Sequence, residues 1–246
     1  MAFDLSIVVP AYDEELRLGG GVSSILEYLT KHSINAELVI VDDGSNDRTA
    51  DVARETAAKF PAISTNVIRY EQNRGKGFAV KTGLQAAKAD IALFSDADLS
   101  TPIDEMNKLL DPIRNGEFDV TFGSRALDRT LIGTHQPWLR EHGGRVVNFM
   151  IRKMSGLDFA DTQCGFKAFN LTKFRPLLDV MTIDRFGFDI EFLFVAQYHG
   201  LKLAEIPVRW NDVAGSKVSP FRDTRRMFGE LSQIRRNART GRYKLN

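Results

Sequence analysis

Short apolar runs alternate with amphipathic helical segments through the first half of the chain, and this alternation restricts the fold more than any other feature. The runs are rich in apolar and β-branched residues, as buried parallel strands are; they are Leu5–Pro10, Leu38–Val41, Ile91–Ser95 and Val120–Phe122. The helical segments between them are Leu16–Lys31, Asp47–Phe60 and Gly77–Ala89. Strand–helix alternation at this spacing predicts parallel βαβ units. In such sheets, ligands bind beyond the carboxyl ends of the strands.

The second half of the chain is less regular. Residues 126–136 show no period and precede Pro137 and Trp138, so we predict a long loop there. Four elements are predicted beyond it: helices over Arg140–Met154 and Phe188–Tyr198, a strand over Leu203–Trp210 and a basic amphipathic helix over Phe221–Arg239. No repeat or linker divides the chain. We therefore expect one α/β domain over residues 1–246, with a largely parallel central sheet flanked by helices and a C-terminal amphipathic helical segment.

Charge and cysteine content exclude several classes of protein. The 33 Lys and Arg residues nearly balance the 32 Asp and Glu residues, so the net charge does not call for a nucleic-acid partner. One cysteine, Cys164, excludes an internal disulfide framework, and its apolar neighbours place it in the core. The first fifteen residues do not resemble a signal peptide, and no apolar run is long enough to span a membrane. We expect a cytoplasmic protein that meets any membrane from its surface.

Acidic residues follow three of the predicted strands. Asp13, Glu14 and Glu15 follow the first, Asp42 and Asp43 the second, and Asp96 and Asp98 the third. Carboxylates gathered at one sheet edge repel one another unless a cation or a donor-rich ligand lies among them. Asp96 and Asp98 have the oxygen ligands that Mg²⁺ or Mn²⁺ prefers. The alternative is that these residues bond their own backbone, as aspartate does at strand ends and turns.

Two turns carry further polar groups. In the turn Asp42–Ser45, one carboxylate can bond a base or ribose while the other caps the turn or faces a metal; the alternative is a plain cap. The segment Gln72–Gly77 places two cations and two glycines at the start of a helix. Glycines allow a phosphate to approach the backbone, and a helix N-terminus favours negative charge. The alternative for this second segment is a solvated turn.

Four segments, residues 7–14, 41–45, 73–77 and 96–98, resemble in order and spacing the nucleotide-sugar half of the family 2 inverting glycosyltransferases. The resemblance covers about residues 5–125 and implies the GT-A fold, in which a metal helps to hold a nucleoside-diphosphate sugar. By position it implies two sets of contacts. The nucleotide sugar would be bound by Pro10, Tyr12, Glu14, Asp42, Asp43, Lys76 and Asp96, with Asp42 on the uracil or ribose. Asp96 and Asp98 would bind Mg²⁺ or Mn²⁺.

Three later segments narrow the branch. Residues 123–125, 161–167 and 186–191 resemble the dolichyl-phosphate β-glucosyltransferases and the neighbouring mannosyl and bacterial polyprenyl-phosphate enzymes. This implies transfer of glucose from UDP-glucose to dolichyl or polyprenyl phosphate. The alternatives are GDP-mannose or another nucleotide sugar as donor, and a glycan or small-molecule hydroxyl as acceptor. The chain then divides into a nucleotide-sugar half (1–125), an acceptor half (126–220) and a basic amphipathic tail (221–246).

An anionic lipid phosphate needs cationic groups to position it rather than a base. Arg125, Arg145 and Lys167 are the candidates, because they can donate charge-assisted hydrogen bonds. The candidate catalytic carboxylates are Asp161, which would align the acceptor or serve as base, and Asp189 and Glu191 behind it. The alternative is structural, with Asp161 capping a turn and the other two carboxylates holding arginines in buried ion pairs.

The segment from Arg222 onward carries eight basic residues against two acidic ones. Its apolar residues, Met227, Leu231, Ile234 and Ala238, recur at helical spacing, which predicts a helix lying on an anionic membrane. The alternative is a solvated basic face above an apolar stripe that packs on the core. No aromatic-interleaved basic stripe supports nucleic-acid binding, so we expect a nucleotide sugar, a lipid acceptor and a membrane surface as partners. A noncatalytic partner-binding protein is the remaining alternative.

Overall fold

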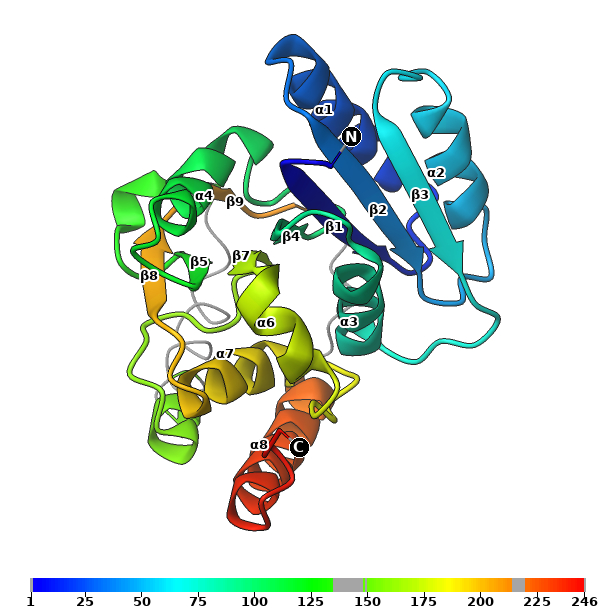
Figure 1. Ribbon diagram of the computed structural model, residues 1–246. Helices are drawn as coiled ribbons and strands as arrows, with labels where there is room; N and C mark the ends of the chain where they lie inside the picture. The colour runs from blue at the N-terminus through cyan, green and yellow to red at the C-terminus, as the bar shows by residue number, and fades with distance from the viewer. Residues whose placement is uncertain (1, 135–147, 149, 214–219, 246) are drawn as a thin grey trace.

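The computed structural model describes residues 2–134, 148, 150–213 and 220–245. Its main sheet has the strand order β3-β2-β1-β4-β7-β5-β8 (Figure 1). The strands are β1 (Leu5–Ala11), β2 (Ala36–Asp42), β3 (Ser64–Arg69), β4 (Ile91–Ser95), β5 (Val120–Ser124), β7 (Phe166–Asn170) and β8 (Leu203–Pro207). All neighbouring strands are parallel except that β7 runs antiparallel to both β4 and β5. The predicted largely parallel sheet is therefore confirmed.

Helices cover both faces of this sheet (Figure 1). They are α1 (Leu18–Lys31), α2 (Thr49–Ala57), α3 (Lys76–Ala86), α4 (Met106–Arg114), α6 (Leu171–Leu178), α7 (Phe188–Tyr198) and α8 (Pro220–Arg239). α1, α2 and α4 form one hydrophobic core with alternate residues of β1 and β2, and α3, α6, α7 and α8 form the other. Along β1, for example, Ile7 faces the first core and Val8 the second. Burial on both faces explains why β1 and β2 are nearly continuous apolar runs.

Several elements differ from the sequence prediction. β3 was missed because it is a sheet-edge strand with a polar, partly exposed sequence. The predicted loop contains a 3₁₀ turn, η2 (Arg129–Leu131), and the short strand β6 (Ile132–Thr134). The predicted strand after Leu203 is divided, since β8 ends at Pro207 and β9 (Trp210–Asn211) pairs with β6. Of the predicted helix 140–154, only residues 148 and 150–154 are described, and these are helical.

The apolar stripe of α8 packs inside the protein. Met227, Leu231 and Ile234 are buried in the core that α8 shares with α7. The expectation that this stripe faces a membrane is therefore wrong, and the alternative of a basic face above a core stripe is confirmed. The arginines of the described part of α8 remain exposed. Among the residues described, the structure has no helix with the length and apolar character needed to cross a bilayer.

Candidate functional site

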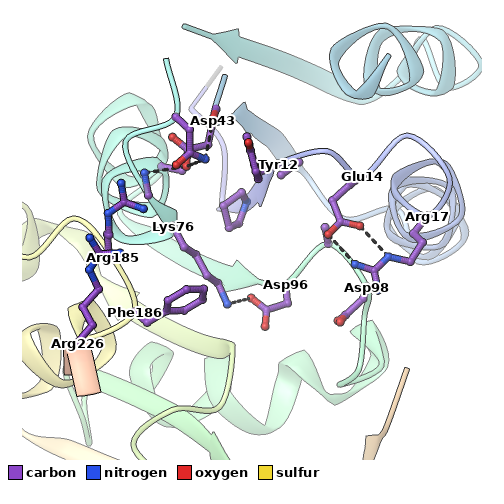
Figure 2. A pocket seen from close by; sticks show the side chains of 16 residues that line it. Tyr12, Glu14, Arg17, Asp43, Lys76, Asp96, Asp98, Arg185, Phe186 and Arg226 are labelled. Carbon is purple, nitrogen blue, oxygen red and sulfur yellow. Dashed lines mark hydrogen bonds and ion pairs between the residues drawn. The ribbon is translucent and has the colours of Figure 1, made fainter. Parts of the chain in front are cut away.

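A pocket of about 350 Å³ lies at the carboxyl ends of β1, β2 and β4 (Figure 2). The sequence predicts ligand binding at this end of the sheet. Seven of the predicted site residues line it: Pro10, Tyr12, Glu14, Asp43, Lys76, Asp96 and Asp98. Pro10 belongs to the end of β1, and the others come from the segments that follow β1, β2 and β4 and from the first turn of α3. Segments that are far apart in the sequence thus meet at one cavity.

The two aspartates at the end of β2 have different positions. Asp43 lines the pocket, and its carboxylate accepts hydrogen bonds from the N–H groups of Arg74 and Gly75, both at 2.8 Å, and from Asn73 Nδ2 at 2.9 Å. It therefore fixes the 73–75 turn beside the pocket. Asp42 is buried and accepts hydrogen bonds from the backbone N–H and hydroxyl of Ser45. Both aspartates are buried, but only Asp43 lines the pocket, so the contact of Asp42 with the nucleotide stays a prediction.

The loop after β1 is held in an unusual backbone conformation. Asp13 has a φ of 49°, a left-handed value that aspartate and asparagine tolerate better than most residues. Its N–H donates to Ser45 Oγ, and its carboxylate accepts from the N–H of Asn46, both at 2.9 Å. The loops after β1 and β2 therefore support each other. Glu14 is in turn held in the pocket by two hydrogen bonds from Arg17, at 2.7 and 2.8 Å.

Lys76 and two carboxylates occupy the pocket floor. Lys76 Nζ lies 2.6 Å from Asp96 Oδ1 (Figure 2). Burial would lower the pKa of Lys76, but the negative charges of Asp96 and Asp189 outweigh it and raise that pKa. Asp98, two residues further on, lines the same pocket. Lys76 is therefore a stable cation beside the carboxylates.

Asp96 and Asp98 offer hard oxygen ligands suited to Mg²⁺ or Mn²⁺. No group of three or more metal-binding side chains occurs within the described ranges, so a cation here would need ligands from a bound diphosphate and water. Gly165 makes room for this arrangement, because a Cβ at that position would overlap the Asp96 carboxylate. The donor set and the space around it thus fit a cation shared with a phosphorylated ligand.

Replacing Gly165 by alanine is expected to weaken metal-dependent UDP binding at least about tenfold, since the added methyl displaces a carboxylate that supplies a charge-assisted contact. Isothermal titration calorimetry with UDP and Mn²⁺ measures this effect. Gly20→Ala is the matched control, because nothing lies within 4 Å of that Cβ and alanine favours the helix interior. Equal UDP affinity in Gly165→Ala and wild type would contradict the assigned role of Asp96.

Two of the three predicted acceptor-phosphate residues are described, and each is paired with a carboxylate. Lys167 is fully buried, and its Nζ donates to Asp189 at 2.5 Å and to the Cys164 carbonyl at 2.6 Å. The ammonium is thus enclosed by the protein and paired with Asp189, and a contact of Lys167 with the acceptor stays a prediction. Arg145 lies outside the described residues. The buried position of Cys164 is confirmed.

Arg125 is engaged by Asp161. Its Nε and a terminal nitrogen donate to the two Asp161 oxygens at 2.6 and 2.8 Å. Burial would raise the pKa of Asp161, but the charge and hydrogen bonds of Arg125 lower it, so the carboxylate is a weak base. Neither residue lines the pocket described above. Asp161 thus orients Arg125, and its role toward an acceptor stays a prediction.

The other two candidate catalytic carboxylates are buried and bound by protein donors. Glu191 is fully buried and accepts hydrogen bonds from the N–H groups of Thr182 and Ile183 and from the Tyr243 hydroxyl. Burial raises its pKa, although these donors oppose the shift. Asp189 is the partner of Lys167. These contacts agree with the structural alternative, which for Asp189 is a buried ion pair with a lysine in place of an arginine. A catalytic role of Asp189 and Glu191 stays a prediction.

Nine lining residues were not assigned to the site from the sequence: Ala11, Arg17, Asn73, Gly75, Ala79, Ala97, Arg185, Phe186 and Arg226. Asn73 and Gly75 belong to the 73–77 segment, whose composition did suggest ligand contact. Arg185 immediately precedes the 186–191 segment, so the sequence indicated a functional segment next to it but gave no sign of a role for Arg185 itself. Arg226 had no local signal, because only the docking of α8 brings it to the pocket.

The largely parallel sheet, the pocket at the carboxyl ends of its strands and the lysine beside paired aspartates agree with the GT-A fold that the sequence predicts. The sequence model described as glycosyl transferase family 2 matches residues 6–177, and the chain belongs to that family. The dolichyl-phosphate β-glucosyltransferase of Dictyostelium discoideum is 31% identical over 98% of this chain and 76% of its own length. The Homo sapiens protein of the same name is 33% identical over 98% of this chain and 78% of its own length.

Solved structures support the fold. The glucosyl-3-phosphoglycerate synthase of Mycobacterium tuberculosis, solved in complex with Mn²⁺, UDP-glucose and phosphoglyceric acid, matches with a TM-score of 0.68. The match covers 94% of this chain and 79% of the synthase chain, at 21% sequence identity. The expected GT-A architecture is thus confirmed.

Proposed function

We propose that this chain transfers glucose from UDP-glucose to dolichyl or polyprenyl phosphate at a membrane surface, with Mg²⁺ or Mn²⁺ as cofactor. The relatives that it matches over nearly its whole length carry the name dolichyl-phosphate β-glucosyltransferase. A structural neighbour of the same fold was solved with Mn²⁺ and UDP-glucose. The pocket supplies residues suited to both parts of such a donor.

One observation carries the choice of a phosphate acceptor: each carboxylate lining the pocket in the described part of the chain already has another task. Glu14 is bound by Arg17, Asp43 holds the 73–75 turn, and Asp96 and Asp98 are the cation ligands proposed above. A hydroxyl acceptor requires a base to remove its proton. A phosphate monoester is already an anion at neutral pH, so this pocket suits it better.

The proposed reaction is a single displacement with inversion. An acceptor phosphate oxygen forms a bond to the anomeric carbon while the bond from that carbon to the UDP oxygen breaks, and UDP leaves with the electron pair. No proton needs to move. Lys76 stabilises the negative charge that develops on the leaving diphosphate, and Asp43 and Asn73 position the nucleoside. A divalent cation held by Asp96 and Asp98 would add Lewis-acid stabilisation of the same diphosphate.

We assign membrane contact to the basic face of α8 and the residues that follow it. Arg235, Arg236, Arg239 and Arg242 are exposed, while the apolar side of the helix is buried. Each basic residue near an anionic bilayer contributes about 1 kcal/mol of attraction. The association we propose is therefore electrostatic and peripheral, on the cytoplasmic membrane face.

The test is a transfer assay with a panel of UDP- and GDP-sugars, corrected for donor hydrolysis, in Mg²⁺ or Mn²⁺. We expect a β-linked glucosyl lipid phosphate from UDP-glucose and a prenyl phosphate, and no product from the matched prenyl alcohol. Product from the alcohol would favour a hydroxyl acceptor, and product from GDP-mannose alone would overturn the donor. Long-chain acceptor in anionic vesicles should react faster than in neutral vesicles, and high salt should remove the difference.

A further inference from the structure

We propose that Arg185 and Arg226 bind the phosphate group of the acceptor. The nature of that acceptor rests on the proposed function, whereas the assignment of an anion to these two arginines rests on the pocket itself. Both residues line it, and Figure 2 shows them on the side opposite Glu14 and Asp98, with Phe186 and Lys76 between. The pocket therefore has a cationic side in addition to its acidic one.

The two arginines differ from the other cations near the site in their partners. Arg17, Lys76 and Arg125 each contact a carboxylate at 2.6 to 2.8 Å. By contrast, no hydrogen bond or salt bridge among the described residues engages the guanidinium group of Arg185 or Arg226. Both guanidinium groups interact electrostatically with the carboxylate of Glu230. Their donors are therefore available to a ligand.

Glu230 and Gly187 fix the position of this pair. The Gly187 N–H donates to Glu230 Oε2 at 2.7 Å, which ties α8 to the turn that carries Arg185. A Cβ on Gly187 would lie 2.6 Å from the same oxygen, so glycine allows this close approach. Arg226 lies four residues before Glu230 and hence on the same helix face. α8 is thereby held with Arg226 at the pocket.

The charge on this side of the pocket suits an anion. Glu230 is the carboxylate tied to the turn beside the two arginines; burial raises its pKa, and the positive charges of Arg226 and Arg185 oppose that shift. Two arginines against one glutamate leave a net positive charge. Guanidinium groups suit phosphate oxygens because they donate paired, charge-assisted hydrogen bonds. The donor diphosphate has its own partners in Lys76 and the Asp96–Asp98 cation ligands, so we assign the arginines to the second phosphate.

The position of α8 agrees with a lipid source for this phosphate. The same helix carries the exposed basic residues assigned to membrane contact, and Arg226 lies in its first half, where it meets the pocket. A lipid phosphate at the bilayer surface would therefore reach the site along the helix that binds the membrane.

The experiment measures binding of a water-soluble ten-carbon prenyl phosphate to the full chain loaded with UDP and Mn²⁺, by calorimetry, with the matching prenyl alcohol as a second probe. We expect Arg226→Gln and Arg185→Gln each to raise the Kd for the prenyl phosphate about 10- to 100-fold, the range of a lost charged hydrogen bond. The Kd for UDP should stay within about twofold. Arg226→Lys should retain part of the affinity. Arg54→Gln, an exposed arginine on α2, is the control.

Each outcome decides one question. Weaker UDP binding with unchanged prenyl phosphate binding would overturn the proposal, since the arginines would then serve the donor. Unchanged affinity for both ligands, or equal wild-type affinity for the prenyl alcohol, would also overturn it. If wild type binds the prenyl phosphate through these arginines but transfers no sugar to it, the proposed function fails while the anion site stands.

Discussion

Asp98→Ala is expected to reduce sugar transfer by about three orders of magnitude, which corresponds to about 4 kcal/mol of lost transition-state stabilisation. The reason is that Asp96 and Asp98 are the two carboxylates available to a cation in the pocket, and Asp96 is also engaged by Lys76. Removing Asp98 leaves a single protein carboxylate for the cation. Steady-state kinetics with UDP-glucose and a prenyl phosphate, at saturating Mg²⁺ or Mn²⁺, measures the loss.

A matched control separates this effect from a change in folding. Asp111→Ala removes an aspartate from the surface of α4, where its partner is the exposed Arg114, and should leave transfer unchanged. Chelation by EDTA should reduce wild-type activity as far as the Asp98 substitution does. If Asp98→Ala keeps more than about a tenth of wild-type activity, or if EDTA has no effect, the cation site is assigned to the wrong residues.

The donor half of the site was predictable because the chemistry lies directly after buried strands. An apolar run that is followed directly by aspartates, as at Asp42 and Asp96, indicates where the strand stops and that carboxylates lie at the ligand-binding end of the sheet. The division of roles between Asp42 and Asp43 was not predictable, because both carboxylates are buried and they differ only in their contacts. Asp42 accepts hydrogen bonds from Ser45, whereas Asp43 holds the 73–75 turn and lines the pocket.

The acceptor half was not predictable from local sequence. β7 lies antiparallel between β4 and β5, inside the sheet. This position places Lys167 in the protein interior, against Asp189 of α7. A lysine in a polar motif gives no sign that it will be enclosed. The apolar stripe of α8 is equally ambiguous, because a stripe that packs on a protein core and one that enters a bilayer have the same 3.6-residue period.

The buried pair Lys167 and Asp189 gives the largest expected effect on stability. Lys167→Met is expected to lower the free energy of unfolding by about 3–5 kcal/mol, because it leaves the Asp189 carboxylate buried without its ammonium partner. Urea unfolding followed by circular dichroism measures the change. Lys173→Met is the control, since Lys173 is largely exposed in its pair with Asp119, and its loss should cost less than about 1 kcal/mol.

The pH dependence of this variant follows from the same carboxylate. Burial raises the pKa of Asp189 even in the wild type, where Lys167 and Lys76 oppose the shift. Without Lys167 that pKa rises further, so the folded variant binds a proton more tightly than the unfolded chain does. An acid whose pKa is raised in the folded state lowers the stability at pH values above its pKa in the unfolded chain. This loss disappears as the pH falls toward the unfolded-state pKa. The stability deficit of Lys167→Met should therefore shrink between pH 7 and pH 5.

The double substitution Lys167→Met with Asp189→Leu distinguishes a buried charge from lost packing. It removes both charges and retains apolar volume, so it should recover most of the stability that Lys167→Met loses, as replacement of buried ion pairs by apolar residues often does. A double variant as unstable as Lys167→Met, with a deficit independent of pH, would show that the lysine acts through packing alone. Recovery of stability without recovery of transfer would instead show that the Asp189 charge is needed beside Lys76, whose pKa it helps to raise.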